Sequence, residues 1–331
     1  MYSDEDLQAA IRAGIFSQEA VAAFRQQVAE RQHTTLADEE HFRLISGFND
    51  IFVVLAGTLL LFSLGWLGGQ LDPVLGFAFA AGGSWGIAEV FVRQRRMALP
   101  AIMSLASFVG SCGMVGISLS GEMNAATILL SGSLGLAAAA AHWRRFHVPI
   151  TIAAAVATLL VTLFGVLLQV FPALQAQPEG LFLIGGLLCF ASAMHWDMAD
   201  PTRQTRKTDI AFWLHLLAAP LIVHPVFSLL GIEDGSASLG GTVLVLVIYA
   251  LFAALSLAVD RRALMVSAMA YVLYALNRLL EANGMVGEGM AVAGVVLGGS
   301  LLLLSAFWHR CRRDVLNALP AHWRARLPAL Q

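Results

Sequence analysis

Residues 209–227 read DIAFWLHLLAAPLIVHPVF, an apolar stretch that contains one aspartate, two histidines and two prolines. At a rise of 1.5 Å per residue, a helix of this length spans about 28 Å, close to the roughly 30 Å of a bilayer's hydrocarbon core. A soluble protein can bury one such helix, but this chain has about nine more stretches of similar apolarity. We therefore predict that the stretch is one span of a polytopic membrane protein.

The composition of the whole chain also indicates a membrane environment. Of its 331 residues, 58% are hydrophobic and 13% are charged, whereas soluble domains carry about 25% charged residues. The long apolar stretches predict an all-α bundle of about ten transmembrane helices. Their approximate bounds are 50–67, 73–92, 98–119, 125–141, 148–170, 180–196, 209–231, 239–259, 263–280 and 288–308.

The basic residues predict the orientation of these spans. All but one of the 20 Lys and Arg residues fall in segments that alternate with acidic loops, and the exception is Arg278. Because Lys and Arg are retained on the cytoplasmic side, we expect a bacterial-type inner (plasma) membrane protein with both termini cytoplasmic. The basic inner face would also suit anionic membrane lipids as partners.

Three parts are expected along the chain. A cytosolic helical hairpin covers 1–48, the transmembrane bundle covers 49–308, and a basic cytosolic tail covers 309–331. Ser17 is placed to cap the second helix of the hairpin.

Several sequence patterns resemble a known group of proteins. These patterns are LQAAIRAGIFSQEAVAAF (7–24), SGFNDIFV (46–53) and FWLHLLAAPLIVHP (212–225). They are similar to uncharacterised bacterial families of multi-pass inner-membrane proteins with an N-terminal cytosolic hairpin. The resemblance implies the hairpin and the spans, but it implies no activity.

The span at 209–231 has features that are typical of a binding site in a transporter. Pro220 and Pro225 each remove a backbone donor and crowd the preceding turn, so we expect the helix to be kinked or broken near mid-membrane. Freed carbonyls at that depth need protein or water, and broken helices often carry the sites of transporters. The alternative is a kinked helix in which His215 and His224 each hydrogen-bond to a neighbour.

Ionisable and polar residues inside the spans form two predicted layers, and such residues often mark function. We expect the pathway or binding candidates to be Glu89, Asp209 and His215 in the inner layer, and His224, Asn277 and Arg278 in the outer layer. Glu89 and His215 lie at similar expected depths, which suggests that they pair and carry a proton. The alternative is local ion pairing of Glu89 with Arg93 and of Arg278 with Glu281.

The loop WDMADPTRQTRKTD (196–209) supports a different hypothesis. Asp197 and Asp200 are weak candidates for a magnesium site, since Mg²⁺ prefers carboxylate oxygens and arginines bind phosphates. The pattern faintly resembles the aspartate motifs of membrane prenyltransferases, but a second aspartate-rich motif is missing. The alternative is a charged cytoplasmic loop. No GxSxG, HExxH, Walker or CxxC motif is present, so no cofactor is expected.

The leading interpretation is a transporter-like protein with a solute or proton pathway around the seventh span. A membrane enzyme acting on lipid or polyprenyl phosphate, and a scaffold that recruits a partner through its hairpin, are the alternatives. No nucleic-acid partner is expected. Small residues at four-residue spacing favour helix packing or a homo-oligomer face. They are Ala78, Gly82 and Gly86, then Ser131, Gly135 and Ala139, and finally Gly294 and Gly298.

Overall fold

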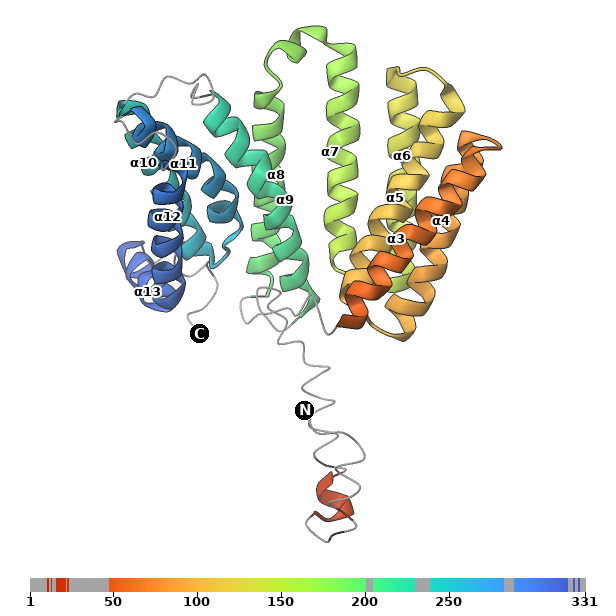
Figure 1. Cartoon of the computed structure of the whole chain (residues 1–331), viewed down its shortest axis with the longest axis horizontal. Helices are drawn as coiled ribbons and strands as arrows, with labels where there is room; N and C mark the ends of the chain where they lie inside the picture. The colour runs from red at the N-terminus through yellow and green to blue at the C-terminus, as the bar shows by residue number, and fades with distance from the viewer. Residues whose placement is uncertain are drawn as a thin grey trace.

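The computed structural model describes residues 11, 13, 16–21, 23, 48–200, 205–229, 239–282, 289–320, 324 and 327. Within these ranges the chain is helical and contains no strand (Figure 1), which confirms the predicted all-α class. Nine helical segments of the described chain are long and apolar enough to cross a membrane. They are α3 (Phe48–Gly69), α4 (Pro73–Ile87) with its π-helical continuation η2 (Ala88–Gln94), α5 (Ala98–Ser120), α6 (Ala125–Phe146), α7 (Ile150–Val170), α8 (Glu179–Met198), α9 (Arg206–Leu229), α10 (Leu239–Val259) and α11 (Ala263–Ala282).

The C-terminal region differs in detail from the expected tenth span and basic tail. Helix α12 (Gly289–Ala306) is followed by α13 (Trp308–Ala318), and the two helices are bent by 78° at the break between them. Among the described residues, these two helices are long and apolar enough to cross a membrane only when they are taken together. Helix α13 packs against α10 and buries Trp308 and Leu316. The first part of the expected tail is therefore a packed helix.

Little of the predicted N-terminal hairpin lies within the described residues. The Ser17 side chain accepts a hydrogen bond from the Ala20 backbone N–H at 3.1 Å, and residues 18–21 are helical. Ser17 therefore caps a helix at the position that the sequence predicts. Gly14 and the residues from Phe24 to Gly47 lie outside the described chain.

Helix α9 is the central helix of the molecule. It contacts α7, α8 and α11. Of its most apolar 18-residue stretch, 56% is buried, a larger share than in any other candidate span of the described chain. In Figure 1, α8 and α9 lie between the group formed by α3 to α7 and the group formed by α10 to α13. The stretch that begins at Asp209 therefore joins two groups of helices, which accounts for its burial on several sides.

Of the predicted kink or break in this helix, the break is wrong. Helix α9 runs without interruption from Arg206 to Leu229, with Pro220 and Pro225 both inside it. Pro220 is exposed on the helix surface, whereas Pro225 is buried. A proline costs a helix one hydrogen bond, but neighbouring helices can stabilise the altered backbone. Here α8 lies directly against α9 at this height.

The contact between α8 and α9 is the most extensive contact between helices in the described chain. A Cβ atom added at Gly186 of α8 would lie 2.8 Å from the backbone carbon of Leu221 in α9. The Cys189 thiol of α8 also donates a hydrogen bond to the Leu214 carbonyl at 3.3 Å. The two backbones approach closely because α8 has glycine where they cross, which is how helices pack in lipid.

The predicted stripes of small residues have different environments. Added Cβ atoms at Gly82, Gly86, Gly294 and Gly298 would meet no described atom within 4 Å. The stripe in α6 does pack, because a Cβ at Gly116 of α5 would lie 2.6 Å from the Ser131 Cα. Gly82 and Gly86 of α4 and Gly294 and Gly298 of α12 therefore make no close helix contact among the described residues.

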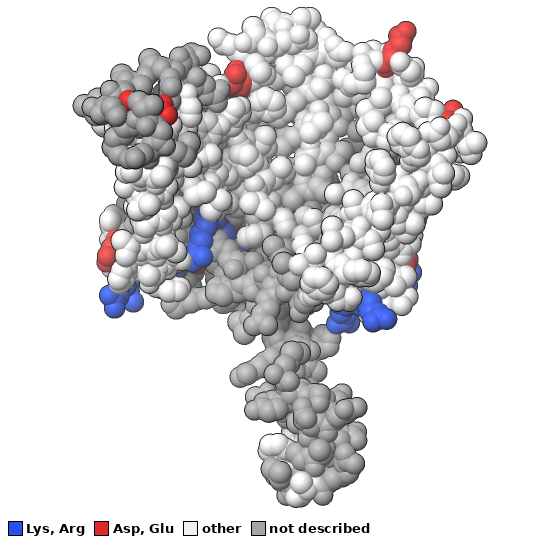
Figure 2. Space-filling model, viewed as in Figure 1, with Lys and Arg blue, Asp and Glu red and all other residues white. Residues whose placement is uncertain are grey.

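Charged residues lie at the two ends of the bundle. On the face shown in Figure 2, Lys and Arg side chains lie toward the lower edge, acidic side chains lie at both ends, and a band of uncharged residues separates them. Asp72, between α3 and α4, accepts a hydrogen bond from the Val74 N–H at 2.7 Å and caps α4. This arrangement is consistent with helices that cross a membrane.

Two glycine substitutions in α8 test this packing. We expect Gly186→Ala to lower the free energy of unfolding by about 1–3 kcal/mol, since the added methyl group would overlap the α9 backbone. Gly180→Ala is the control, because a Cβ at Gly180 has no neighbour within 4 Å. Thermal unfolding of both purified variants in detergent measures the difference. Equal transition temperatures would contradict the close approach of α8 and α9.

Candidate functional site

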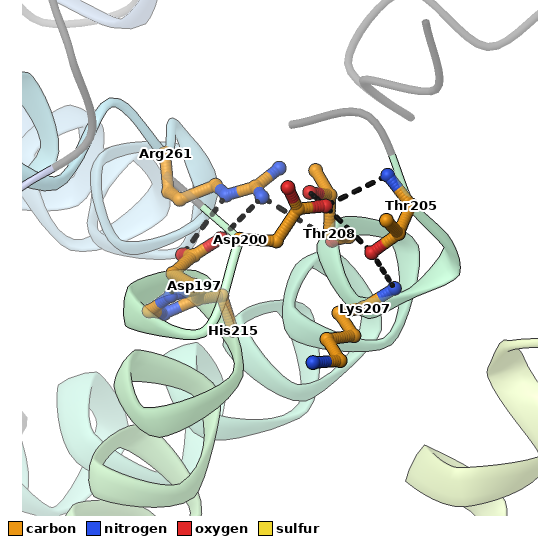
Figure 3. Close-up of polar contacts among 7 residues, drawn as sticks. All are labelled: Asp197, Asp200, Thr205, Lys207, Thr208, His215 and Arg261. Atoms are coloured by element: carbon orange, nitrogen blue, oxygen red, sulfur yellow. Dashed lines mark hydrogen bonds and ion pairs between the residues drawn. The ribbon is translucent and has the colours of Figure 1, made fainter. Parts of the chain in front are cut away.

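A buried carboxylate lies at the C-terminal end of α8, where α8, α9 and the turn after α10 meet. Asp197 is 1% exposed, and its two oxygens bind two different side chains (Figure 3). The His215 Nε2 atom of α9 lies 2.9 Å from Oδ2. The Arg261 guanidinium donates to Oδ1 at 2.7 Å, and its Nε lies 3.4 Å from Oδ2. We call Asp197, His215 and Arg261 the buried triad.

The charges of the buried triad balance when the histidine is neutral. Because an ionised carboxylate only accepts hydrogen bonds, the proton between His215 and Asp197 is carried by Nε2. Arg261 and Asp197 then cancel each other, and one more proton on His215 gives the site a net positive charge. His215 is 3% exposed and its ring contacts Phe190 edge to face, with centroids 5.1 Å apart. An added charge in such surroundings is costly.

The backbone around Asp260 positions Arg261. Asp260 has a φ of 60°, in the left-handed region, and the Arg261 N–H donates to the Ser256 carbonyl at 2.9 Å. This pattern ends α10 in the way that glycine usually ends helices. The Asp260 side chain accepts a hydrogen bond from the Trp308 indole at 2.7 Å. The same turn therefore contacts α13 through Asp260 and the buried triad through Arg261.

A second aspartate connects the end of α8 to the start of α9. Asp200 Oδ2 accepts hydrogen bonds from the Thr205 N–H and hydroxyl, both at 2.7 Å, and from the Thr208 hydroxyl at 3.1 Å. Thr205 caps α9, because its hydroxyl accepts from the Lys207 N–H at 3.3 Å. Arg261 also donates to the Thr208 carbonyl at 3.2 Å. Asp200 and the buried triad thus belong to one connected network.

The weak metal candidates have other roles in this network. Asp197 is paired with Arg261 and His215, and Asp200 with two threonines. Among the described residues, no group of three or more His, Cys, Asp or Glu side chains could hold a metal ion. The contacts of both aspartates are those of a structural network rather than of an open carboxylate pair.

The predicted partner of His215 is wrong. His215 is buried beside an acid as expected, but the acid is Asp197 rather than Glu89. Glu89 lies in η2 and contacts Arg145 of α6 through two hydrogen bonds, of 2.6 and 3.1 Å. It also pairs with Arg93 at 3.1 Å, as the alternative reading predicted. The similar depth of Glu89 and His215 did not make them neighbours, because their helices face different partners.

The outer candidates lie apart from the buried triad. His224 and Tyr271 of α11 share a hydrogen bond. The Asn277 amide donates to Glu281 at 3.0 Å, so Glu281 has a partner other than the expected one. The side chain of Arg278 lies outside the described residues. Asp209 is buried, 6% exposed, six residues before His215 on α9, and Pro220 is exposed away from both layers.

Sequence reasoning did not identify Arg261, Thr205 and Thr208. Thr205 stands just before RKTD at the start of a periodic apolar stretch, which is a recognisable capping signal. Arg261 gave no such signal, because DRR (260–262) is indistinguishable in sequence from an ordinary basic loop. Only the packing of α8, α9 and α11 shows that this arginine is 2% exposed.

The chain was compared with known proteins in three ways. No family model matches it, and neither the curated proteins nor the solved structures include a match. The resemblance of residues 7–24, 46–53 and 212–225 to uncharacterised membrane families therefore stays a prediction. Function has to be argued from the site itself.

Substituting Arg261 tests the pairing in the buried triad. We expect Arg261→Gln to lower the free energy of unfolding by about 3–5 kcal/mol, since it leaves the Asp197 carboxylate buried without its cation. In the double variant Asp197→Asn/Arg261→Gln both charges are gone, so the loss should be clearly smaller. Unfolding of the wild type, the two single variants Asp197→Asn and Arg261→Gln, and the double variant by denaturant, followed by circular dichroism, gives the coupling energy. Additive losses would contradict a direct ion pair.

Proposed function

We propose that this chain is an integral membrane transport protein in which the buried triad carries a proton, alone or together with a small solute. The observation that supports the proposal is a titratable imidazole at 3% exposure, hydrogen-bonded to a carboxylate that a second cation shares. Ionisable groups within spans are costly and often mark proton or ion pathways.

The shared carboxylate links protonation to helix positions. When His215 is neutral, Arg261 is the cation that binds Asp197 among the described residues. A protonated His215 brings a second positive charge to the same two oxygens, and the two cations repel each other. Because Arg261 belongs to the turn between α10 and α11 while His215 belongs to α9, protonation favours separation of these segments. A proton-dependent movement of the α10 to α13 group is the expected consequence.

The described conformation is closed between the two layers. His224 lies nine residues after His215, about 14 Å further along α9, and contacts Tyr271 of α11 rather than α8. The intervening Ala218, Ala219 and Val223 are at most 1% exposed. A proton or solute therefore needs α9 to shift against α8 or α11 before it can pass from one layer to the other.

The two alternatives find less support in these contacts. An enzyme acting on a lipid phosphate needs accessible carboxylates, but Asp197 and Asp200 are 1% and 6% exposed and hold protein partners. A scaffold function depends on the hairpin, which lies largely outside the described residues. Transport remains the function that uses the buried triad itself.

Proton movement through reconstituted liposomes tests the proposal. A potassium diffusion potential should drive proton uptake into the liposomes, which an enclosed pH-sensitive dye reports. Uptake is measured without added solute and then with an amino acid, a sugar or a divalent cation in the outside medium. We expect His215→Gln to abolish this uptake, because glutamine keeps an N–H donor but cannot titrate. His195→Gln is the matched control, since His195 is exposed on α8. The proposal fails if His215→Gln liposomes take up protons like the wild type.

We also propose that the ends bearing the Arg and Lys clusters face the cytoplasm of a bacterial-type cell. The support is the distribution of basic residues along the chain, which the positive-inside rule relates to orientation. In a background lacking Cys112, Cys189 and Cys311, single cysteines at Glu122 and Glu179 should react with an impermeant maleimide added to intact cells. Cysteines at Gln94 and Lys207 should react only after lysis. Labelling of Lys207→Cys in intact cells would reverse the orientation.

A further inference from the structure

A pocket of about 580 Å³ lies between α3, α4 and α5, away from the buried triad. Its α3 wall carries Thr58, Phe62 and Trp66 at four-residue spacing, which places them on one helix face. Ser107 and Ser111 form the α5 wall in the same way, and Phe77 lies on α4. The volume falls within the range of pockets that bind small molecules, about 300–1,000 Å³.

The pocket is polar near the middle of α3 and α5, and it is aromatic toward the C-terminal end of α3. Thr58 lies ten residues into α3 and Ser107 nine residues into α5, so both are about 14–15 Å from the start of their helices and near mid-membrane. Phe62 and Trp66 follow along α3 toward the opposite end, with ring centroids 6.2 Å apart. None of the described residues that line the pocket is charged. These surroundings suit a neutral molecule.

The Thr58 and Ser111 hydroxyls lack the hydrogen bond to a backbone carbonyl that several other Ser and Thr side chains of the described helices make. Among the described residues, six side chains donate to the carbonyl four residues earlier, at 2.7–2.9 Å. They are Ser63, Ser84, Thr158, Thr162, Ser192 and Ser300. Ser111 is only 9% exposed, yet its hydroxyl makes no hydrogen bond within the described chain. Thr58 is exposed on α3, and its hydroxyl likewise has no hydrogen-bond partner among the described residues. In the same part of the chain, the hydrogen bond of Ser107 is the one it shares with the Ser84 hydroxyl, at 2.8 Å.

A buried hydroxyl without a partner, such as that of Ser111, is costly at mid-membrane depth, where bulk water is absent. Ser111 and the exposed Thr58 both line the pocket, so a ligand there can accept hydrogen bonds from both hydroxyls. Such a ligand needs an oxygen that accepts hydrogen bonds at its leading end and an apolar body behind it. A flat ring would also stack between Phe62, Trp66 and Phe77, because aromatic pairs favour offset or edge contacts.

We propose that this pocket binds a neutral, lipid-soluble ring carbonyl compound of the quinone class. Its carbonyl oxygen accepts hydrogen bonds from Ser111 and Thr58, its ring contacts the aromatic wall, and its apolar tail extends toward Trp66 and the end of α3. This binding site is independent of the proton pathway at α9. The two proposals therefore succeed or fail separately.

Quinone binding can be measured with the full-length protein in lipid nanodiscs. A short-chain quinone such as decylubiquinone is titrated in, and quenching of tryptophan fluorescence is followed. We expect saturable quenching, a smaller amplitude in Trp66→Phe, and affinity lowered roughly 2- to 10-fold by Ser111→Ala, the effect of one lost hydrogen bond. Thr58→Val, which keeps the side-chain shape, should act in the same direction.

Matched variants separate this site from general partitioning into lipid. Ser63→Ala lies on the same helix, but its hydroxyl donates to the Leu59 carbonyl, so its affinity should equal that of the wild type. Gly69→Leu should block the pocket, since Gly69 lines it and has open space around it. Each variant is first checked for the gel-filtration elution volume and the thermal transition temperature of the wild type. If Ser111→Ala changes either one, Thr58→Val is used in its place. Quenching that does not saturate, or equal affinities for Ser63→Ala and the hydroxyl variants, would overturn the proposal and indicate that only bulk lipid chains fill the pocket.

Discussion

The Asp197 carboxylate constrains the junction of α8, α9 and the turn after α10, because a buried charge must keep its partners. At 1% exposure it requires both Arg261 and His215 within hydrogen-bonding reach. His215 fixes the rotation of α9 against α8, and Arg261 fixes the turn after α10. Asp260, one residue earlier, binds Trp308 and so extends the same constraint to α13. One carboxylate thereby relates four segments that are distant in sequence.

Helix α9 can serve as the central helix even though it contains two prolines. Pro220 lies on its exposed surface, where the altered backbone meets no close neighbour that has to adapt. Pro225 is buried and removes the donor for the Leu221 carbonyl. Gly186 of α8 lies against the backbone at Leu221, so this weakened turn is supported by a second helix. The helix therefore stays continuous where the sequence suggested a break.

The sequence predicted the elements well because each depends on local patterns. The expected span at 98–119 is close to the observed Ala98–Ser120, and the other described spans agree within a few residues. Neighbours were harder to predict, since depth does not specify rotation or lateral position. Asp197 is one residue from the end of α8, whereas His215 lies nine residues, or about 14 Å, from the start of α9. The two side chains meet because the ends of the paired helices are not level, which leaves no sequence signal, and similar expected depth points to Glu89 instead.

The energetics of the buried triad favour a role beyond stability. Replacing a buried ion pair with apolar side chains of similar volume is often neutral or stabilising, whereas removing one partner is strongly destabilising. A protein selected only for a stable junction would therefore gain from leucine or methionine at these positions, as at Leu214 and Val223 nearby. Three ionisable groups at 1–3% exposure differ from an apolar junction in that one of them, His215, can bind a proton. In the proposed transport function, protonation of His215 would change how strongly the shared Asp197 holds α9 to the turn after α10, and coupled transport would depend on that change.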